Sequence, residues 1–204
     1  VKGYALKPEK QSLYNKIKSG LNVDSVISDI RNYERVKKEI TSFQPDFIFH
    51  LAAQPLVRES YAIPVETFEV NAIGSAHVLD CLRSLKKKCI CVIVTTDKVY
   101  NNIEKHYAYK EYDKLGGYDP YSASKAAAEI VTESFRLSYF NPGDFTMHRK
   151  SIASGRAGNV IGGGDYAKDR IVPDIFRALS KKKPIEVRNP AAIRPWQHVL
   201  EPLY

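Results

Sequence analysis

Cys89-Ile90-Cys91-Val92-Ile93-Val94-Thr95 is an uninterrupted apolar run rich in β-branched residues, and Thr96, Asp97 and Lys98 follow it directly. A run of this length and type predicts a strand buried on both faces of a parallel sheet. The polar residues after it then stand where the strand ends.

Apolar strand-like runs and segments of helical period alternate on either side of this stretch. We expect further strands at residues 1–5, 46–51 and 151–157, and helices at residues 32–42, 65–85, 121–140 and 169–180. Strands that alternate with helices of this length predict an α/β fold, a Rossmann-type doubly wound parallel sheet with crossover helices.

The composition is that of an ordinary globular protein. The 204 residues are 44% hydrophobic and 26% charged, which excludes the disordered class and is ample for one sizeable core. No stretch is long and apolar enough to span a bilayer, and no signal-peptide pattern is present, so we expect no membrane association. Cys81, Cys89 and Cys91 are odd in number and lie in or near apolar segments, so we expect buried, reduced thiols and a cytoplasmic protein.

The net charge of +8 raises the question of a nucleic-acid partner. The basic residues are scattered or lie in short runs, 86–88 and 181–183, which each follow a predicted helix. Cations favour the C-terminal end of a helix dipole and face water there. We therefore expect no nucleic-acid partner, and a smaller share of the charge can serve a phosphorylated substrate.

Unusual segments follow two of the predicted strands. Residues 52–55, Ala-Ala-Gln-Pro, follow one strand, and residues 95–98, Thr-Thr-Asp-Lys, follow another. In open parallel sheets, ligands bind beyond the carboxyl ends of the strands. Small side chains at the first segment would let a flat ring approach the backbone, while polar side chains at the second would reach the same crevice.

A helix with a strong start signal follows these segments. Asp119 can cap free N–H groups, and Pro120 suits the first helical position. Tyr121 and Lys125 stand four residues apart and therefore share one helix face. An ammonium near a phenol lowers its pKa, so Tyr121 could take a proton from a sugar hydroxyl while hydride leaves to a nicotinamide.

These segments together resemble a known family. Tyr121-Ser122-Ala123-Ser124-Lys125, with residues 116–120 before it and 95–100 upstream, resembles the extended short-chain dehydrogenase/reductase family. Residues 50–58, 156–165, 188–190 and 193–199 are similar to the nucleotide-sugar 4,6-dehydratases, in the branch that acts on CDP-glucose. The resemblance spans almost the whole chain in the expected order.

The resemblance implies a lyase. Such enzymes oxidise the sugar at C4, remove water across C5 and C6, and return the hydride to C6, and they feed the synthesis of deoxysugars for cell-surface polysaccharide such as lipopolysaccharide O-antigen. Tyr121 would be the base at C4, Lys125 would tune it, and Thr96 would bind the C4 hydroxyl. Asp97 would protonate the departing C6 hydroxyl, a role that requires a pKa raised by burial.

The role of Lys98 stays open between two hypotheses. Relatives that act on dTDP-glucose have Glu at this position, and a protonated Lys cannot accept the C5 proton. Either Lys98 is neutral in the site and acts as the base, or it acts electrostatically and another group is the base.

The resemblance also implies NAD as the cofactor and no metal ion. The residues expected to bind NAD are Asp29, Ile30, Leu51, Ala52, Ala53, Gln54, Asn71, Thr95, Tyr121 and Lys125. The Gly-rich turn that holds the pyrophosphate is expected before Val1, so we expect the chain to be an incomplete copy. Tyr4 occupies the place where an acidic residue would select NAD, so this choice rests on the resemblance alone.

The substrate is expected to contact the C-terminal part of the chain. The resemblance implies that Asn159 meets the diphosphate of CDP-glucose and that Arg170, Arg194 and His198 lie near the nucleotide, and Arg188 is a further substrate-binding candidate. The guanidinium fork matches two phosphate oxygens, which suits the arginines to this role. The glycine run 162–164 is not followed by Lys-Ser/Thr, so a P-loop is not expected there.

We expect residues 1–160 to form the NAD-binding domain, without its phosphate-loop segment, and residues 161–204 to begin a truncated nucleotide-sugar-binding region. A homodimer built on the helices at 65–85 and 121–140 is expected by analogy. The alternatives are another nucleotide-sugar dehydratase of the same superfamily, an epimerase or reductase of that superfamily, which needs no acid at Asp97, and a non-catalytic nucleotide- or RNA-binding module that kept the fold.

Overall fold

The computed structural model describes residues 1–103 and 105–204. Its strands are β1 (Lys2–Ala5), β2 (Asp24–Ile27), β3 (Phe47–His50), β4 (Cys89–Val94), β5 (Lys150–Gly155), β6 (Asn159–Ile161) and β7 (Trp196–His198). Its α-helices are α1 (Leu13–Ile17), α2 (Tyr33–Phe43), α3 (Val57–Ala62), α4 (Pro64–Phe68), α5 (Gly74–Arg83), α6 (Pro120–Ser138), α7 (Phe145–His148) and α8 (Ile171–Ser180). Shorter turns are η1 (Lys18–Gly20), the π-helix η2 (Glu69–Ile73), η3 (Asp97–Val99) and η4 (Pro142–Asp144).

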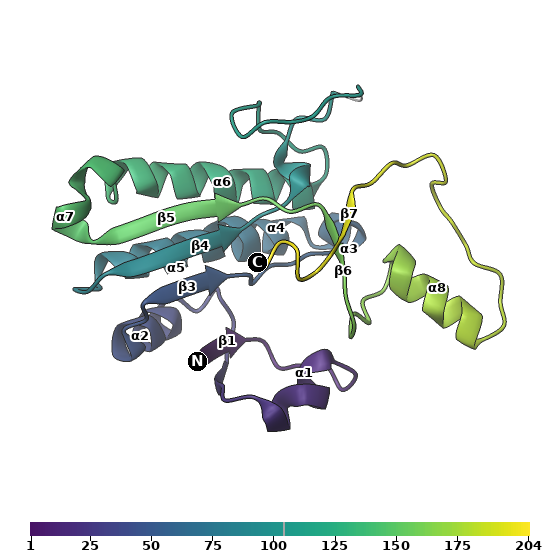
Figure 1. Cartoon of the computed structure of the whole chain (residues 1–204), viewed down its shortest axis with the longest axis horizontal. Helices are drawn as coiled ribbons and strands as arrows, with labels where there is room; N and C mark the ends of the chain where they lie inside the picture. The colour runs from purple at the N-terminus through teal and green to yellow at the C-terminus, as the bar shows by residue number, and fades with distance from the viewer. Residues whose placement is uncertain (104) are drawn as a thin grey trace.

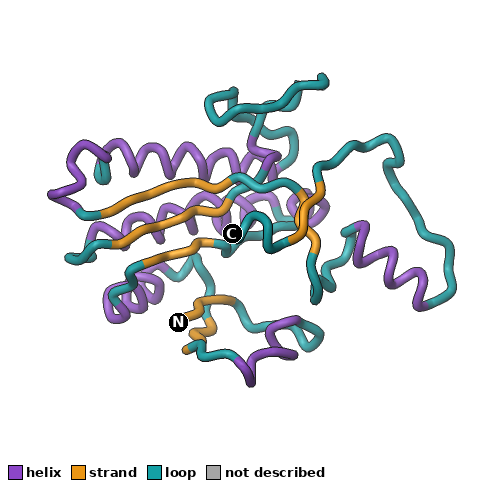
Figure 2. Tube along the Cα trace, viewed as in Figure 1, coloured by secondary structure: helices purple, strands orange, loops and turns teal. Residues whose placement is uncertain are grey.

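The apolar run at residues 89–95 forms the middle strand of the central sheet. β4 pairs in parallel with β3, where His50 lies opposite Ile93, and with β5, where Val94 lies opposite Gly155. The strand order is β3-β4-β5, and the three strands run side by side, as arrows in Figure 1 and as orange tubes in Figure 2. The segments that follow these strands therefore meet at one edge of the sheet.

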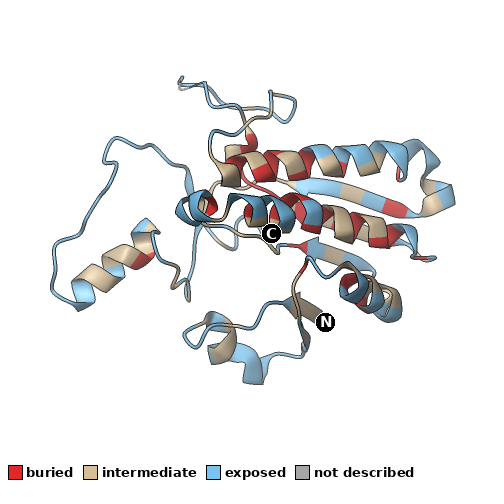
Figure 3. Cartoon of the chain, turned by 180° about the vertical axis from the view of Figure 1, so that it is seen from behind, coloured by how far each residue is buried: buried red, intermediate tan, exposed pale blue. Residues whose placement is uncertain are grey.

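Helices α2, α5 and α6 pack on one face of this sheet (Figure 1). Burial alternates along β4: Cys89, Cys91 and Ile93 face the helices and are fully buried, and the residues between them are half-buried. The sequence predicted that β4 is buried on both faces, but only the face toward the helices is fully buried. Among the described residues, no helix covers the other face, which is turned toward the viewer in Figure 1, whereas Figure 3 shows buried residues in red along the helices behind it.

The first two strands form a separate parallel pair, in which Lys2 lies opposite Asp24. In the described part of the chain this pair is not hydrogen-bonded to β3, so the parallel strands lie in more than one sheet (Figure 2). The sequence did not indicate β2, because Asp24-Ser25-Val26-Ile27 is short and half polar. The Tyr4 hydroxyl at the end of β1 donates to the carbonyl oxygen of Asp29, 2.8 Å away.

The helical stretch expected at residues 65–85 is present but not uniform. It consists of α4, the π-helix η2 and α5 in direct succession. The wide turn of η2 contains Asn71, which is 1% exposed. Single π-turns inside helices occur often at functional sites.

The three cysteines are free and fully buried, as expected, and burial raises the pKa of the Cys81 thiol to about 12. Of the helices that the structure describes, none is long and apolar enough to cross a membrane. The C-terminal segment contributes α8 and the parallel pair β6–β7, in which Asn159 lies opposite Trp196.

Candidate active site

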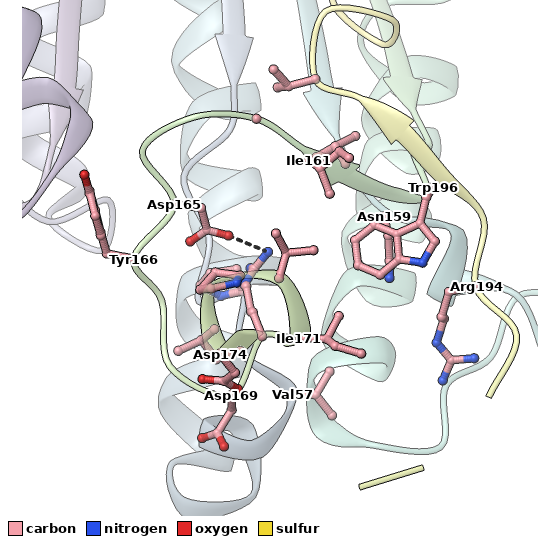
Figure 4. Close-up of a pocket in the computed structure, with 18 of the residues that line it drawn as sticks. Val57, Asn159, Ile161, Asp165, Tyr166, Asp169, Ile171, Asp174, Arg194 and Trp196 are labelled. Atoms are coloured by element: carbon pink, nitrogen blue, oxygen red, sulfur yellow. Dashed lines mark ion pairs between the residues drawn. The ribbon is translucent and has the colours of Figure 1, made fainter. Parts of the chain in front are cut away.

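A cavity of about 1160 Å³ lies beyond the carboxyl ends of β4 and β5. Its lining includes three of the predicted catalytic residues, Thr96, Lys98 and Tyr121. It also includes the residues predicted to bind substrate on the C-terminal part of the chain, Asn159, Arg170, Arg188 and Arg194. Figure 4 shows the side chains of β6, β7 and α8 that surround this space.

Tyr121 stands in the first turn of α6, where the sequence predicted it. The Asp119 carboxylate caps the helix by accepting from Ser122 N at 2.9 Å, and Pro120 occupies the first turn. Gly117 approaches this turn so closely, with φ +154°, that a Cβ would lie 2.4 Å from Ala123 N. A side chain is therefore excluded at Gly117, and the loop before the helix packs directly on its start.

The phenol of Tyr121 is in a less polar environment than the sequence suggested. Burial raises the pKa of Tyr121, and a hydrogen bond with Thr96 and the charge of Arg170 oppose this shift. Lys125 is not among the leading causes of this shift. The pKa of Tyr121 is therefore raised overall, whereas the sequence predicted that Lys125 would lower it.

Lys125 points toward the sheet. Its Nζ donates to the Val94 carbonyl oxygen at 2.7 Å, and the residue is 6% exposed. Burial lowers the pKa of Lys125 to about 8, although the charge of Glu129 raises it. The lysine stem is long enough to carry the ammonium past Tyr121 to the end of β4, which residue spacing alone does not show.

Thr96, Asp97 and Lys98 form the short η3 turn after β4. The Thr96 hydroxyl donates to Asp97 Oδ1 at 3.0 Å and accepts from Lys98 N at 3.4 Å. Lys98 Nζ donates both to Asp97 Oδ1, at 3.1 Å, and to Asn159 Oδ1, at 3.2 Å. The Asp97 side chain is 30% exposed and does not line the cavity, and its role as the acid stays a prediction.

Asn71 fixes the loop that follows β3. Its Oδ1 accepts from Gln54 N at 2.8 Å, and its Nδ2 donates to Gln54 O at 3.2 Å and to Ser124 Oγ at 2.8 Å. Ser124 lies on α6 between Tyr121 and Lys125. Asn71 thus joins the loop after β3 to the helix that bears the catalytic candidates.

The remaining cofactor candidates lie at the ends of β2 and β3, outside the cavity lining. Asp29 is paired with Arg31 at 2.7 Å, and hydrogen bonds from Arg31 lower the pKa of the Asp29 carboxyl. Ile30 is buried in the core, while Leu51 is exposed. Ala52 and Ala53 place no bulk beyond a methyl group at the end of β3.

The predicted substrate residues are mostly brought together. Asn159 on β6 faces Trp196 on β7, and Figure 4 shows these two side chains beside each other. Arg194 lines the cavity from the segment before β7. His198 does not: it is exposed, and its Nδ1 accepts from Leu200 N at 3.3 Å.

Arg188 and Arg170 hold acidic partners. Arg188 Nη1 donates to Asp169 Oδ1 at 2.6 Å, and Arg58 on α3 donates to the same oxygen at 2.7 Å. Arg170 lies 4.0 Å from Asp165, the ion pair that is dashed in Figure 4. Arg58 was not predicted as a site residue, because its position between the expected strand at 46–51 and the expected helix at 65–85 does not show that it reaches the C-terminal segment.

Two further polar residues that support the site were not predicted. Ser60 Oγ accepts from Tyr121 N at 3.1 Å, and Glu129 on α6 is buried beneath Thr95. Glu129 stands four residues after Lys125, and this spacing was the only available signal.

Comparison with known proteins identifies the family. The model of the family described as GDP-mannose 4,6 dehydratase matches residues 6–202. The chain belongs to this family. CDP-glucose 4,6-dehydratase of Salmonella typhimurium is 48% identical over 204 residues, which is 100% of this chain and 57% of the relative. CDP-paratose 2-epimerase of Salmonella typhi is 36% identical over 124 residues, 53% of this chain and 36% of the relative.

Solved structures of this dehydratase family and its neighbours have the same fold. dTDP-glucose 4,6-dehydratase of Streptomyces venezuelae, solved with NAD, gives a TM-score of 0.75 at 25% identity over 90% of this chain and 53% of that one. UDP-glucuronic acid 4-epimerase of Bacillus cereus gives 0.80 at 20% identity over 98% and 62%. The predicted Rossmann-type fold and the resemblance to CDP-glucose 4,6-dehydratases are thus confirmed. The chain spans between 36% and 62% of the length of these relatives.

Proposed function

We propose that the protein of which this chain is part converts CDP-glucose to CDP-4-keto-6-deoxyglucose with NAD as a catalytic cofactor. The observation that carries the proposal is the convergence of Thr96, Lys98 and Tyr121 with several arginines on one cavity. Hydroxyl, phenol and amine groups suit proton transfers on a hexose, and guanidinium groups suit a diphosphate. The 48% identity to a CDP-glucose 4,6-dehydratase supports this substrate.

The residues expected around NAD are compatible with it. Asn71 holds the loop after β3 in place through Gln54, and Ala52 and Ala53 in this loop carry small side chains that would let a flat ring approach the backbone. Lys125 is buried, and its Nζ donates to the Val94 carbonyl oxygen at the end of the neighbouring strand. When bound, NAD supplies a hydride acceptor and returns the same hydride.

The chemistry divides among the residues of the cavity edge. Tyr121 removes the proton of the C4 hydroxyl as the C4 hydride leaves, and Thr96 holds that hydroxyl. Asp97 then supplies the proton with which the C6 hydroxyl departs as water, while the C5 proton is removed by Lys98 or by a group that Lys98 assists. A hydride added at C6 and a proton returned to C5 give the 4-keto-6-deoxy sugar.

The substrate subsite is the arginine-rich side of the cavity. We assign the diphosphate to Asn159, Arg170, Arg188 and Arg194, and we place His198 at its edge because its side chain stands outside the lining. Residues 1–160 would serve NAD and residues 161–204 the nucleotide sugar. The protein would act in the cytoplasm, feed deoxysugar synthesis for cell-surface polysaccharide, and form a homodimer.

The proposed dimer would use the helices at 65–85 and 121–140. Apolar side chains are exposed on them: Val65, Ile73, Ile130 and Leu137. Burial of such a surface is favourable and gives a homodimer interface its apolar core.

The test is to incubate the full-length protein and NAD with one nucleotide sugar at a time: CDP-glucose, and candidate hexoses linked to dTDP, UDP or GDP. A mass decrease of one water with CDP-glucose, and a much slower reaction with the others, is the expected result. Inversion of a sugar hydroxyl without loss of water would favour the epimerase alternative.

A further inference from the structure

Glu129 lies one turn beyond Lys125 on α6, and its carboxylate is buried against the ends of β4 and β5. Its side chain is 5% exposed. Oε1 accepts from Thr95 Oγ1 and from Arg156 Nε at 2.9 Å, and Oε2 accepts from Ser154 Oγ at 2.7 Å and from Arg156 Nη2 at 3.2 Å. Four donors on three strand-end residues therefore satisfy both oxygens.

Arg156 continues the network to the other side of the η3 turn. It directly follows β5, and its side chain is 17% exposed. Nη1 donates to the Tyr100 hydroxyl at 3.0 Å and to the Glu111 carbonyl oxygen at 2.9 Å, and the guanidinium lies 4.9 Å from the centre of the Tyr100 ring. Because Thr95 precedes η3 and Tyr100 follows it, the network holds both ends of the turn that bears Asp97 and Lys98.

We propose that Glu129 and Arg156 form a buried positioning pair that holds η3 and Lys125 in place relative to Tyr121. This inference rests on the proposed function, because it assigns the pair to the same reaction. Neither residue lines the cavity of about 1160 Å³. Both therefore act through the residues that they hold.

Glu129 is also the acidic residue of α6 closest in sequence to Lys125. Burial lowers the pKa of Lys125 to about 8, and the charge of Glu129 is the force that opposes this lowering. His50 on β3 stays neutral near this ammonium, because burial and the charge of Lys125 lower its pKa to about 4. The elements packed around this region bring further titratable groups to it: Tyr121 on α6, Asp97 and Lys98 after β4, and Arg156 after β5.

The experiment compares Glu129→Gln with Glu39→Gln in the full-length protein. Glu39 forms an ion pair of similar burial with Lys2, at 2.7 Å and with side chains 10% and 18% exposed, on α2 away from the site. Both variants remove one buried carboxylate, so a purely structural effect should be shared. Turnover is measured against pH, and the Lys125 amine is titrated by NMR with labelled lysine, assigned through Lys125→Met.

Glu129→Gln should lower kcat about tenfold or more with little change in KM for CDP-glucose, and it should move the Lys125 titration down by about one pH unit. Glu39→Gln should change neither quantity. Glu129→Asp keeps the charge and should restore the Lys125 titration. A folded Glu129→Gln protein with the wild-type kcat and an unchanged Lys125 titration would overturn the proposal.

A second variant keeps the test decisive if Glu129→Gln does not fold. Arg156→Lys keeps the positive charge, but the lysine cannot hydrogen-bond Glu129 and Tyr100 at once as the forked guanidinium does. The kcat should therefore fall, while the pKa of Lys125 should not change. Wild-type kcat in this variant contradicts the positioning role. If the wild-type protein does not dehydrate CDP-glucose, the proposed function fails, whereas the Lys125 titration still tests the coupling to Glu129.

Discussion

The Lys125 ammonium donates to the Val94 carbonyl oxygen at 2.7 Å, at the end of the central strand and not at the Tyr121 phenol. The buried amine thus joins α6 to β4 at the point where the polar residues of the site begin. Its environment disfavours the charged form, and the pKa of Lys125 is lowered to about 8.

Lys125→Met should abolish turnover and yet stabilise the fold near neutral pH. The folded chain binds the Lys125 proton only below about pH 8, whereas the unfolded chain binds it up to about 10.5. The contribution of Lys125 to the free energy of unfolding is therefore fully present above pH 10.5 and is lost as the pH falls to 8. The loss is about 3 kcal/mol at most. Urea unfolding at neutral pH measures the gain in Lys125→Met, and a variant less stable than the wild type at every pH would contradict this account.

Tyr121→Phe should lower turnover about 10³-fold while CDP-glucose still binds. The backbone contacts of this position remain, since Tyr121 N donates to Ser60 Oγ at 3.1 Å and Tyr121 O accepts from Ser124 Oγ at 2.8 Å. Tyr118→Phe is the matched control, because Tyr118 is fully exposed three residues away and should tolerate the change. Near-normal turnover in Tyr121→Phe would rule out the phenol as the base.

Asp97→Asn should oxidise the sugar at C4 but stall before water is lost, because only the elimination needs an acid. Single-turnover mass analysis should then find a 4-keto-hexose in place of the 4-keto-6-deoxy product. Since the Asp97 side chain is 30% exposed and paired with Lys98, this is the most exacting test of the assigned roles. Normal product at an undiminished rate would place the acid elsewhere.

The two hypotheses for Lys98 separate in solvent deuterium. If Lys98 is the C5 base, both Lys98→Met and Lys98→Arg should lose exchange of the C5 proton. If it acts only as a positive charge next to Asp97 and Asn159, Lys98→Arg should keep most of the exchange.

His50 should make the protein sensitive to acid. Burial and then the charge of Lys125 lower the pKa of His50 from 6.5 to about 4, and its Nε2 lies 3.1 Å from Ser75 Oγ. The unfolded chain takes up this proton below pH 6.5 and the folded chain only near pH 4, so about 3 kcal/mol of unfolding free energy is lost over that window. In denaturant unfolding, His50→Gln should lose less unfolding free energy than the wild type between these pH values. The same dependence of unfolding free energy on pH in both proteins would contradict the assignment.

The sequence predicted the central strand and the catalytic helix because their signals are local. The apolar run 89–95 and the Asp119-Pro120 cap each specify an element without reference to the rest of the chain. β2 was not predicted, because its four residues, two polar and two apolar, are too few to show a periodic pattern. The π-turn around Asn71 was not predicted, because one wide turn leaves the apolar pattern of the helix nearly the same as that of a regular α-helix.

The site was predicted as a set of residues and less well as a geometry. Tyr121, Thr96 and Lys98 do share a cavity, but the spacing of Tyr121 and Lys125 could not show which way a long lysine stem turns. Glu129 was missed because a glutamate in a helix is normally solvated. Its burial follows from donors on two strands far away in sequence.

The most direct test of the central claim follows the hydride. The full-length protein is given CDP-glucose with deuterium at C4, and the product is analysed by mass and by NMR at C6. The account predicts loss of one water and deuterium at C6, with the cofactor not consumed. A product that lacks the deuterium, or reduced cofactor formed in equal amount with product, would contradict it.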